Sequence, residues 1–76
     1  GKNYLLRRDT KMRIITAYYC ILIIDRANEK GLNRYGYDIR PQIAMLLGDI
    51  NDHKRLVYKE HYLDKLKILQ RKYAHQ

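Results

Sequence analysis

The chain has 76 residues, enough for one small domain, and 16 Lys and Arg against eight Asp and Glu give it a formal net charge of +8. Because 46% of its residues are hydrophobic, it is too apolar to be a disordered basic tail. The positive surplus favours a polyanionic partner: nucleic acid, an acidic protein or an anionic membrane surface.

The first thirteen residues form a basic segment, in which five bases against Asp9 give a net charge of +4. We expect residues 1–9 to be a basic arm or a short leading turn. Such an arm can lie along phosphates or reach into a minor groove without any further motif. The bases expected to contact nucleic acid here are Lys2, Arg7, Arg8, Lys11 and Arg13.

Residues 14–24 carry no charge and are rich in β-branched and aromatic side chains, which favours a strand. Their length and lack of alternation favour a buried helix instead. The helical pattern continues without a breaker to Gly31, a C-cap glycine, and Asp9 or Thr10 can cap its start. We therefore predict a helix at about 11–30 that is apolar nearly all round at its centre and forms the central buried element.

Two further helices are predicted after a glycine-containing loop. Asp38 can cap the first of them, at about 39–48, and Gly48 interrupts it. The other runs from about 52 to 73. No repeat or linker divides the chain. We therefore expect a single all-α domain over residues 1–76, a small bundle of about three helices.

The corner at residues 43–57 resembles a helix-turn-helix motif. That motif needs a small residue, usually Ala, and a Gly four positions later where the turn takes a positive φ. Ala44 and Gly48 have this spacing, but Asp49 follows where an apolar residue is expected, so an ordinary helix–glycine–helix corner is the alternative. A true motif would place the start of the third helix in the major groove. It would then present Asn51, His53, Lys54, Arg55 and Lys59.

The third helix carries a stripe of tyrosine and leucine at steps of three and four residues. This stripe is either part of the core or a face left for a partner, since tyrosine is enriched at interfaces. The bases between these positions fit a solvated face as well as a track for a polyanion. The candidate interface residues are Tyr58, Tyr62, Leu66, Leu69 and Tyr73.

The residue types and their spacing argue against catalysis and metal binding. There is no serine, phosphate loop or paired-carboxylate motif, and the lone Cys20 has no base in a local motif. His53 and His61 lie two helical turns apart, too far to share a zinc ion. The uncharged run of eleven residues is also shorter than the roughly 20 of a membrane span. We expect no enzymatic activity, cofactor, metal, small-molecule substrate or membrane partner, and an intracellular location in the cytoplasm or nucleus.

Residues 11–19, with Tyr35, Gly36, Pro41 and the tyrosine-rich last helix, resemble the helical domain of a GINS replication subunit. The second arginine and the tryptophan usual in that family are missing here, so no site is carried over. The resemblance implies a place in a larger DNA-associated assembly.

The sequence therefore predicts a small helical nucleic-acid-binding domain with a regulatory role, directed to DNA rather than RNA. Its phosphate contacts would come from the N-terminal arm and the start of the last helix. The alternative is a protein-interaction or oligomerisation module, either a homodimer or part of a larger DNA-associated assembly.

Overall fold

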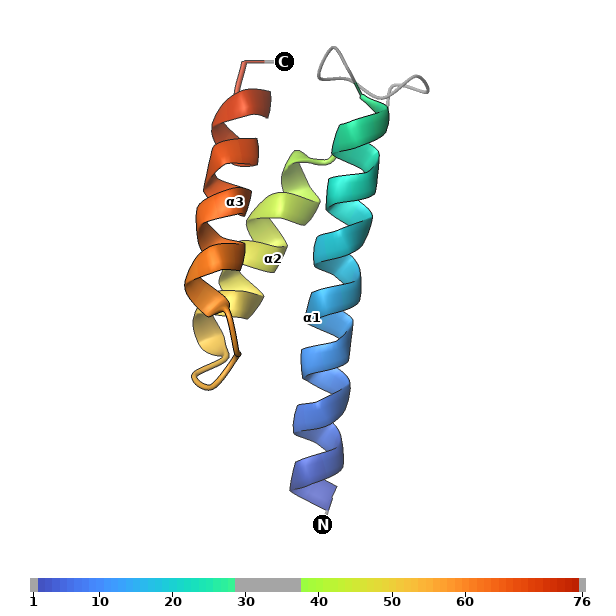
Figure 1. Cartoon of the computed structure of the whole chain (residues 1–76), viewed down its shortest axis with the longest axis vertical. Helices are drawn as coiled ribbons and strands as arrows, with labels where there is room; N and C mark the ends of the chain where they lie inside the picture. The colour runs from blue at the N-terminus through green and yellow to red at the C-terminus, as the bar shows by residue number, and fades with distance from the viewer. Residues whose placement is uncertain (1, 29–37, 76) are drawn as a thin grey trace.

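The computed structural model describes residues 2–28 and 38–75, with side chains from residue 9 onward. Three helices make up this part of the chain: α1 (Lys2–Ala27), α2 (Arg40–Asp52) and α3 (Lys59–Tyr73) (Figure 1). No strand occurs in these ranges, so residues 14–24 are helical and the prediction of a small all-α bundle is confirmed.

The predicted start of the first helix is too late. Residues 2–9 continue α1 toward the N-terminus, where an arm or short leading turn is expected from the sequence. This segment contains no Gly or Pro, and its Leu, Arg and Lys residues are good helix formers. α1 ends at Ala27, and the predicted C-cap residue Gly31 lies outside the described residues.

The second helix begins next to the predicted cap. Oδ1 of Asp38 accepts a hydrogen bond from the backbone N–H of Arg40 (3.0 Å), and the carboxylate also pairs with the Arg40 guanidinium (2.7 Å). Hydrogen bonds from Arg40 lower the pKa of Asp38 to about 2. Asp38 therefore holds the exposed start of α2 with a charge that suits a helix N-terminus.

The corner between α2 and α3 lies later in the chain than the glycine pattern predicts. α2 runs through Gly48, which is exposed, and a Cβ atom at this position would meet nothing within 4 Å. Ala44 is exposed as well, so neither residue serves the close helix approach of a helix-turn-helix motif. The connection is residues 53–58, and Tyr58 takes the left-handed backbone conformation (φ 62°) just before α3.

α2, not α1, holds the middle of the bundle, because α1 and α3 both pack more extensively against α2 than against each other (Figure 1). α1 buries one side, with Ile14, Tyr18 and Ile21 in the core, and leaves Tyr19 and Ile23 exposed. Its N-terminal turns extend beyond the α2–α3 connection (Figure 1). The expectation of a centrally buried first helix is therefore wrong within a single chain, since only one side of it is covered.

The core joins the three helices through thirteen buried hydrophobic side chains among the described residues. Those of α2 and α3 follow steps of three and four residues, apart from the adjacent Tyr62 and Leu63, so each helix turns one face inward. They are Ile14, Tyr18, Ile21, Ile39, Ile43, Leu46, Ile50, Leu56, Tyr62, Leu63, Leu66, Leu69 and Tyr73.

A polar contact closes the far end of the bundle between α1 and α3. Oδ1 of Asp25 accepts hydrogen bonds from the Tyr73 hydroxyl (2.6 Å) and the Lys72 ammonium (2.7 Å). Burial alone would raise the pKa of Asp25, but these two hydrogen bonds and the positive charges of Lys72 and Lys65 outweigh it and hold that pKa below its usual value. Burial, followed by the bond to Asp25, raises the pKa of Tyr73 to about 12, while the nearby Asn28 amide acts in the opposite direction.

Candidate nucleic-acid interface

The connection between α2 and α3 forms a hollow that is open to solvent. Asp52, His53, Lys54 and Arg55 line about 370 Å³ of space there. Lys54 and Arg55 are exposed, and neither forms an ion pair with a described carboxylate. An anion can therefore reach both bases from solvent.

A second, smaller hollow of about 160 Å³ joins this connection to α1. Thr10 and Arg13 of α1 line it together with Asp49, Asp52 and His53. The fold thus brings Arg13 close to His53, a neighbour that the sequence does not indicate. We call Arg13, His53, Lys54 and Arg55 the turn site.

Two carboxylates reduce the positive charge of the turn site. Asp49 and Asp52 line the smaller hollow, and Asp52 also lines the larger one. Arg13, Lys54 and Arg55 against these two aspartates leave little positive potential inside the hollows. The positive potential is higher at the rim, where Lys54 and Arg55 extend into solvent.

Lys59 makes internal contacts with the end of α2. Its ammonium donates hydrogen bonds to the backbone carbonyl oxygens of Asn51 (2.9 Å) and His53 (3.3 Å). A positive charge at the C-terminus of a helix satisfies its last carbonyls and complements the helix dipole. Lys59 therefore caps α2.

His53 lies in the connection with its backbone N–H bonded to the carbonyl oxygen of Ile50 (3.1 Å). The Nδ1 atom of its ring is buried and has no hydrogen-bond partner among the residues that the structure describes. Asn51, at the end of α2, is exposed. Of these two predicted contacts, only Asn51 is fully open to a ligand.

The predicted bases of the N-terminal segment divide into two groups. Lys11 and Arg13 are exposed on α1. Lys2, Arg7 and Arg8 belong to the same helix by their backbone, and their side chains lie outside the described part.

The candidate interface stripe on α3 is for the most part core. Tyr62, Leu66, Leu69 and Tyr73 are all less than a tenth exposed, whereas Tyr58 is 72% exposed in the connection. The four buried residues offer no surface to a partner, because they pack against the other helices of the same chain.

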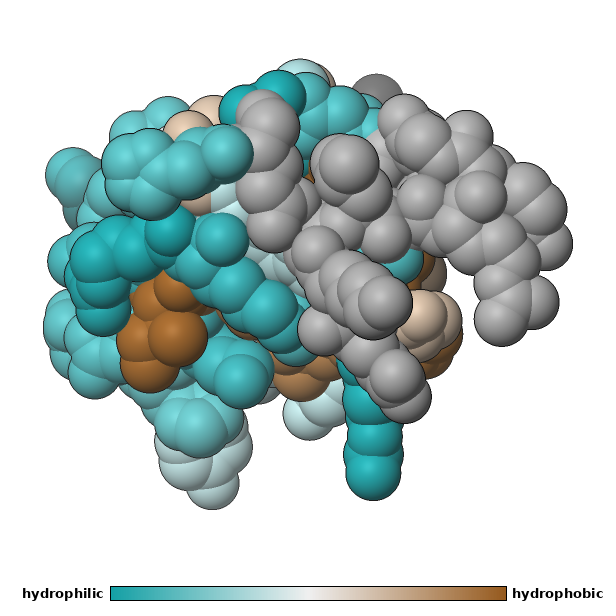
Figure 2. All heavy atoms as spheres, turned by 90° about the horizontal axis from the view of Figure 1, so that it is seen from above, coloured by the Kyte–Doolittle hydropathy of each residue, from teal (hydrophilic) through white to brown (hydrophobic). Residues whose placement is uncertain are grey.

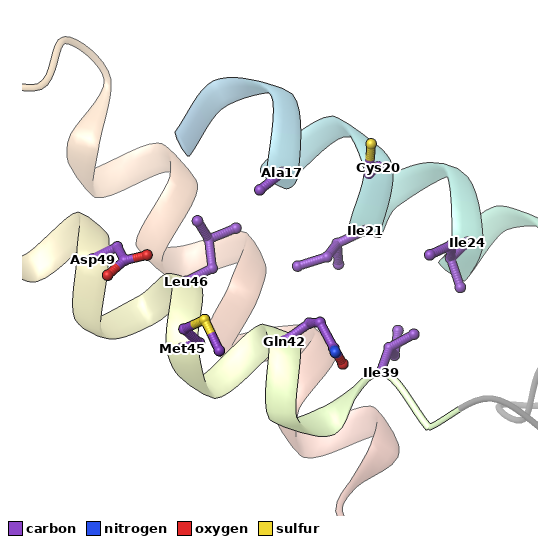
Figure 3. A pocket seen from close by; sticks show the side chains of 9 residues that line it. All are labelled: Ala17, Cys20, Ile21, Ile24, Ile39, Gln42, Met45, Leu46 and Asp49. Carbon is purple, nitrogen blue, oxygen red and sulfur yellow. The ribbon is translucent and has the colours of Figure 1, made fainter. Parts of the chain in front are cut away.

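A groove between α1 and α2 is a feature that the sequence reasoning missed. It holds about 250 Å³, and its lining includes Ala17, Cys20 and Ile24 of α1 opposite Gln42 and Met45 of α2 (Figure 3). Cys20 points outward at its edge. The signal that could have revealed the groove is the absence of charge on every side of residues 14–24.

The described residues contain no cluster of metal-ligating side chains and no helix able to span a membrane. Side chains of His, Cys, Asp and Glu do not gather there in groups of three or more that could hold a metal ion. None of the three helices combines the length and hydropathy that crossing a bilayer requires. Comparison with known proteins finds no matching family, no matching curated protein and no matching solved structure.

Proposed function

We propose that this chain is a nucleic-acid-binding, regulatory domain that holds duplex DNA through phosphate contacts. The observation that carries this proposal is the lack of charge neutralisation. Among the described residues, only Arg40 and Lys72 form ion pairs, with Asp38 and Asp25. The remaining exposed bases can meet phosphates without breaking an internal contact.

The rim of the turn site is the position we favour for these phosphates. Lys54 and Arg55 stand side by side on an exposed connection, and Arg13 approaches from α1. Asp49 and Asp52 would repel a phosphate deep in the hollows, so the backbone of the nucleic acid should rest on the outer bases. Contacts of this kind position a duplex and carry no sequence information by themselves.

The test is a fluorescence-anisotropy titration with a short DNA duplex, the matching single strand and the matching RNA duplex. At about 50 mM salt we expect the DNA duplex to bind most tightly, and we expect affinity to fall steeply toward about 200 mM. An absence of binding at the lower salt concentration would overturn the proposal, and tighter binding of RNA would overturn the preference for DNA.

A pair of double variants locates the contact. Lys54→Gln with Arg55→Gln removes two charges at the turn, and Lys67→Gln with Arg71→Gln removes two exposed charges from α3. Each phosphate contact contributes about −0.9 to the log–log salt slope, so the first variant should flatten that slope by about 1.8. The second variant should leave it nearly unchanged. Equal effects of the two variants would contradict a contact centred on the turn.

A further inference from the structure

The connection between α2 and α3 displays four exposed side chains in two successive turns. Lys54 and Arg55 occupy the first turn, and Val57 and Tyr58 occupy the second. Leu56 lies between the turns and is only 6% exposed, because it packs into the core. The burial of Leu56 therefore leaves two bases and two apolar side chains in solvent on one short segment. We call these four exposed residues the tip.

Tyr58 holds an exposed aromatic ring in an uncommon backbone conformation. Its side chain is 72% exposed, and its backbone is left-handed (φ 62°, ψ 24°). A bulky residue seldom adopts this conformation, which glycine adopts readily. Among the described residues, the ring contacts no other aromatic ring and the hydroxyl has no hydrogen-bond partner. No such contact within the described chain accounts for a tyrosine at this position, and its ring is open to an external partner.

Two internal contacts hold the tip in place. The Lys59 ammonium bonds to the backbone carbonyl oxygens of Asn51 (2.9 Å) and His53 (3.3 Å), so it joins the two ends of the connection. Leu56 fixes the middle of the connection to the core. A side chain on a segment that is already ordered loses less conformational freedom on binding than one on a mobile loop. The tip is therefore arranged for a ligand before the ligand arrives.

We propose that Tyr58 stacks on an unpaired base of the DNA whose phosphates rest on Lys54 and Arg55. The preferred ligand is then a duplex with a single-stranded extension. This inference rests on the proposed function and adds a contact with a base to the contacts with phosphates. The Cα atoms of Arg55 and Tyr58 lie at most about 11 Å apart along the chain, so both side chains can reach neighbouring nucleotides of one strand. Basic groups that hold the backbone beside a ring that stacks on bases are the usual means of binding a single strand.

An unpaired base suits the tip better than a base inside the duplex. A wedge between paired bases must unstack them, and proteins that do this recover the cost by wrapping bent DNA over more of their surface. Within residues 53–58, Val57 is the only other exposed apolar side chain, so the tip offers little such surface. A base that is already unpaired needs the least energy to leave its stack. An anionic membrane is a poorer match, because an interfacial anchor needs an extended apolar face.

Fluorescence anisotropy of the whole chain with three DNA probes at about 50 mM salt tests the stacking contact. The probes are a blunt duplex, the same duplex with a short single-stranded overhang, and the same duplex with an overhang of abasic nucleotides. The two overhangs carry the same phosphates, so a difference between them reports contact with bases rather than charge. We expect the wild-type chain to bind the intact overhang about tenfold more tightly than the abasic one, equivalent to about 1.4 kcal/mol.

Three substitutions separate stacking from apolar contact. Tyr58→Leu keeps an apolar side chain but removes the ring, so its affinities for the two overhangs should agree within about twofold. Tyr58→Phe keeps the ring and should retain the wild-type preference. The matched control is Tyr19→Leu, which removes a ring that is 54% exposed on α1 and should also retain the preference. Circular dichroism should show every variant folded, since both tyrosines are more than half exposed.

The three probes distinguish failure of the stacking contact from failure of the proposed function. Binding of the blunt duplex together with equal binding of the two overhangs would overturn the stacking contact alone. A preference that survives in Tyr58→Leu, or that Tyr19→Leu loses equally, would also overturn it. A lack of binding to all three probes would overturn the proposed function and this inference with it. Binding to phosphatidylserine vesicles but not to the overhang would overturn the inference and identify the tip as a membrane contact.

Discussion

Asp25 ties α1 to the end of α3 through a single carboxylate oxygen, which accepts from both Lys72 and Tyr73. Replacing Asp25 by Asn removes the charged acceptor of a hydroxyl that is otherwise buried. We expect Asp25→Asn to lower the free energy of unfolding by about 2 kcal/mol, measured by urea denaturation. The control is Asp64→Asn on the exposed surface of α3, which should change it by less than about 0.5 kcal/mol. Equal losses in the two variants would show that the contact contributes nothing specific.

The same contact makes stability depend on pH in two windows. The folded-state pKa of Asp25 is lowered, so its contribution is present above the usual value of 3.8 and is lost as the pH falls through the folded value. The pKa of Tyr73 is raised to about 12, so its contribution is present below 10 and is lost between 10 and 12. Unfolding free energies measured across these windows should fall at both ends.

Tyr73→Phe isolates the alkaline window of this prediction. The variant should lose less stability than the wild type between pH 10 and 12. Some loss will remain, because burial and the neighbouring Tyr19 and Tyr62 also raise the pKa of Tyr18. Identical alkaline curves for the two proteins would contradict the role of the Tyr73 hydroxyl.

At the scale of helices, nothing in the structure of α2 requires a glycine at position 48. It is exposed within the helix, and a Cβ atom there would meet nothing within 4 Å. Gly48→Ala should therefore raise the free energy of unfolding by about 1 kcal/mol, the difference in helix propensity. Ala44→Gly, one turn earlier on the same exposed surface, should lower it by a similar amount. A loss of stability in Gly48→Ala would indicate a turn at that position.

The behaviour of α2 explains which parts of the fold could be predicted. The spacing of Ile43, Leu46 and Ile50 predicts a helical face, and all three are buried. Gly48 suggests an end to the helix, but burying Ile50 and Leu46 on one continuous face outweighs its propensity cost of about 1 kcal/mol. The true corner depends on the left-handed conformation of Tyr58, which a bulky residue seldom adopts and which no sequence pattern announced.

The candidate site likewise has features that the sequence predicts and features that it does not. The surplus of bases and the basic character of residues 1–13 can be predicted from the sequence alone. The hollow that Arg13 and His53 line together, and the cap that Lys59 forms on α2, depend on how the chain returns after the connection. Contacts between residues far apart in sequence are set by the packing of whole helices, which periodicity within one helix does not specify.

As a whole molecule, the described chain is elongated, measuring 45 × 21 × 16 Å, because α1 is longer than the two helices packed against it (Figure 1). Seen from the end where α1 and α3 terminate, hydrophilic residues dominate the described surface and apolar ones appear in separate patches (Figure 2). A small domain buries a modest share of its surface, and Tyr19 and Ile23 of α1 are among its exposed large hydrophobic residues.

The bond between Asp25 and Lys72 spans 47 residues of the sequence. A ribosome adding about 5 to 20 residues per second needs roughly 2 to 10 s to cover that distance. For that interval the nascent α1 lacks the α3 side chains that close the end of the bundle. The newborn protein therefore forms its contact between α1 and α3 only after residue 73 has been synthesised.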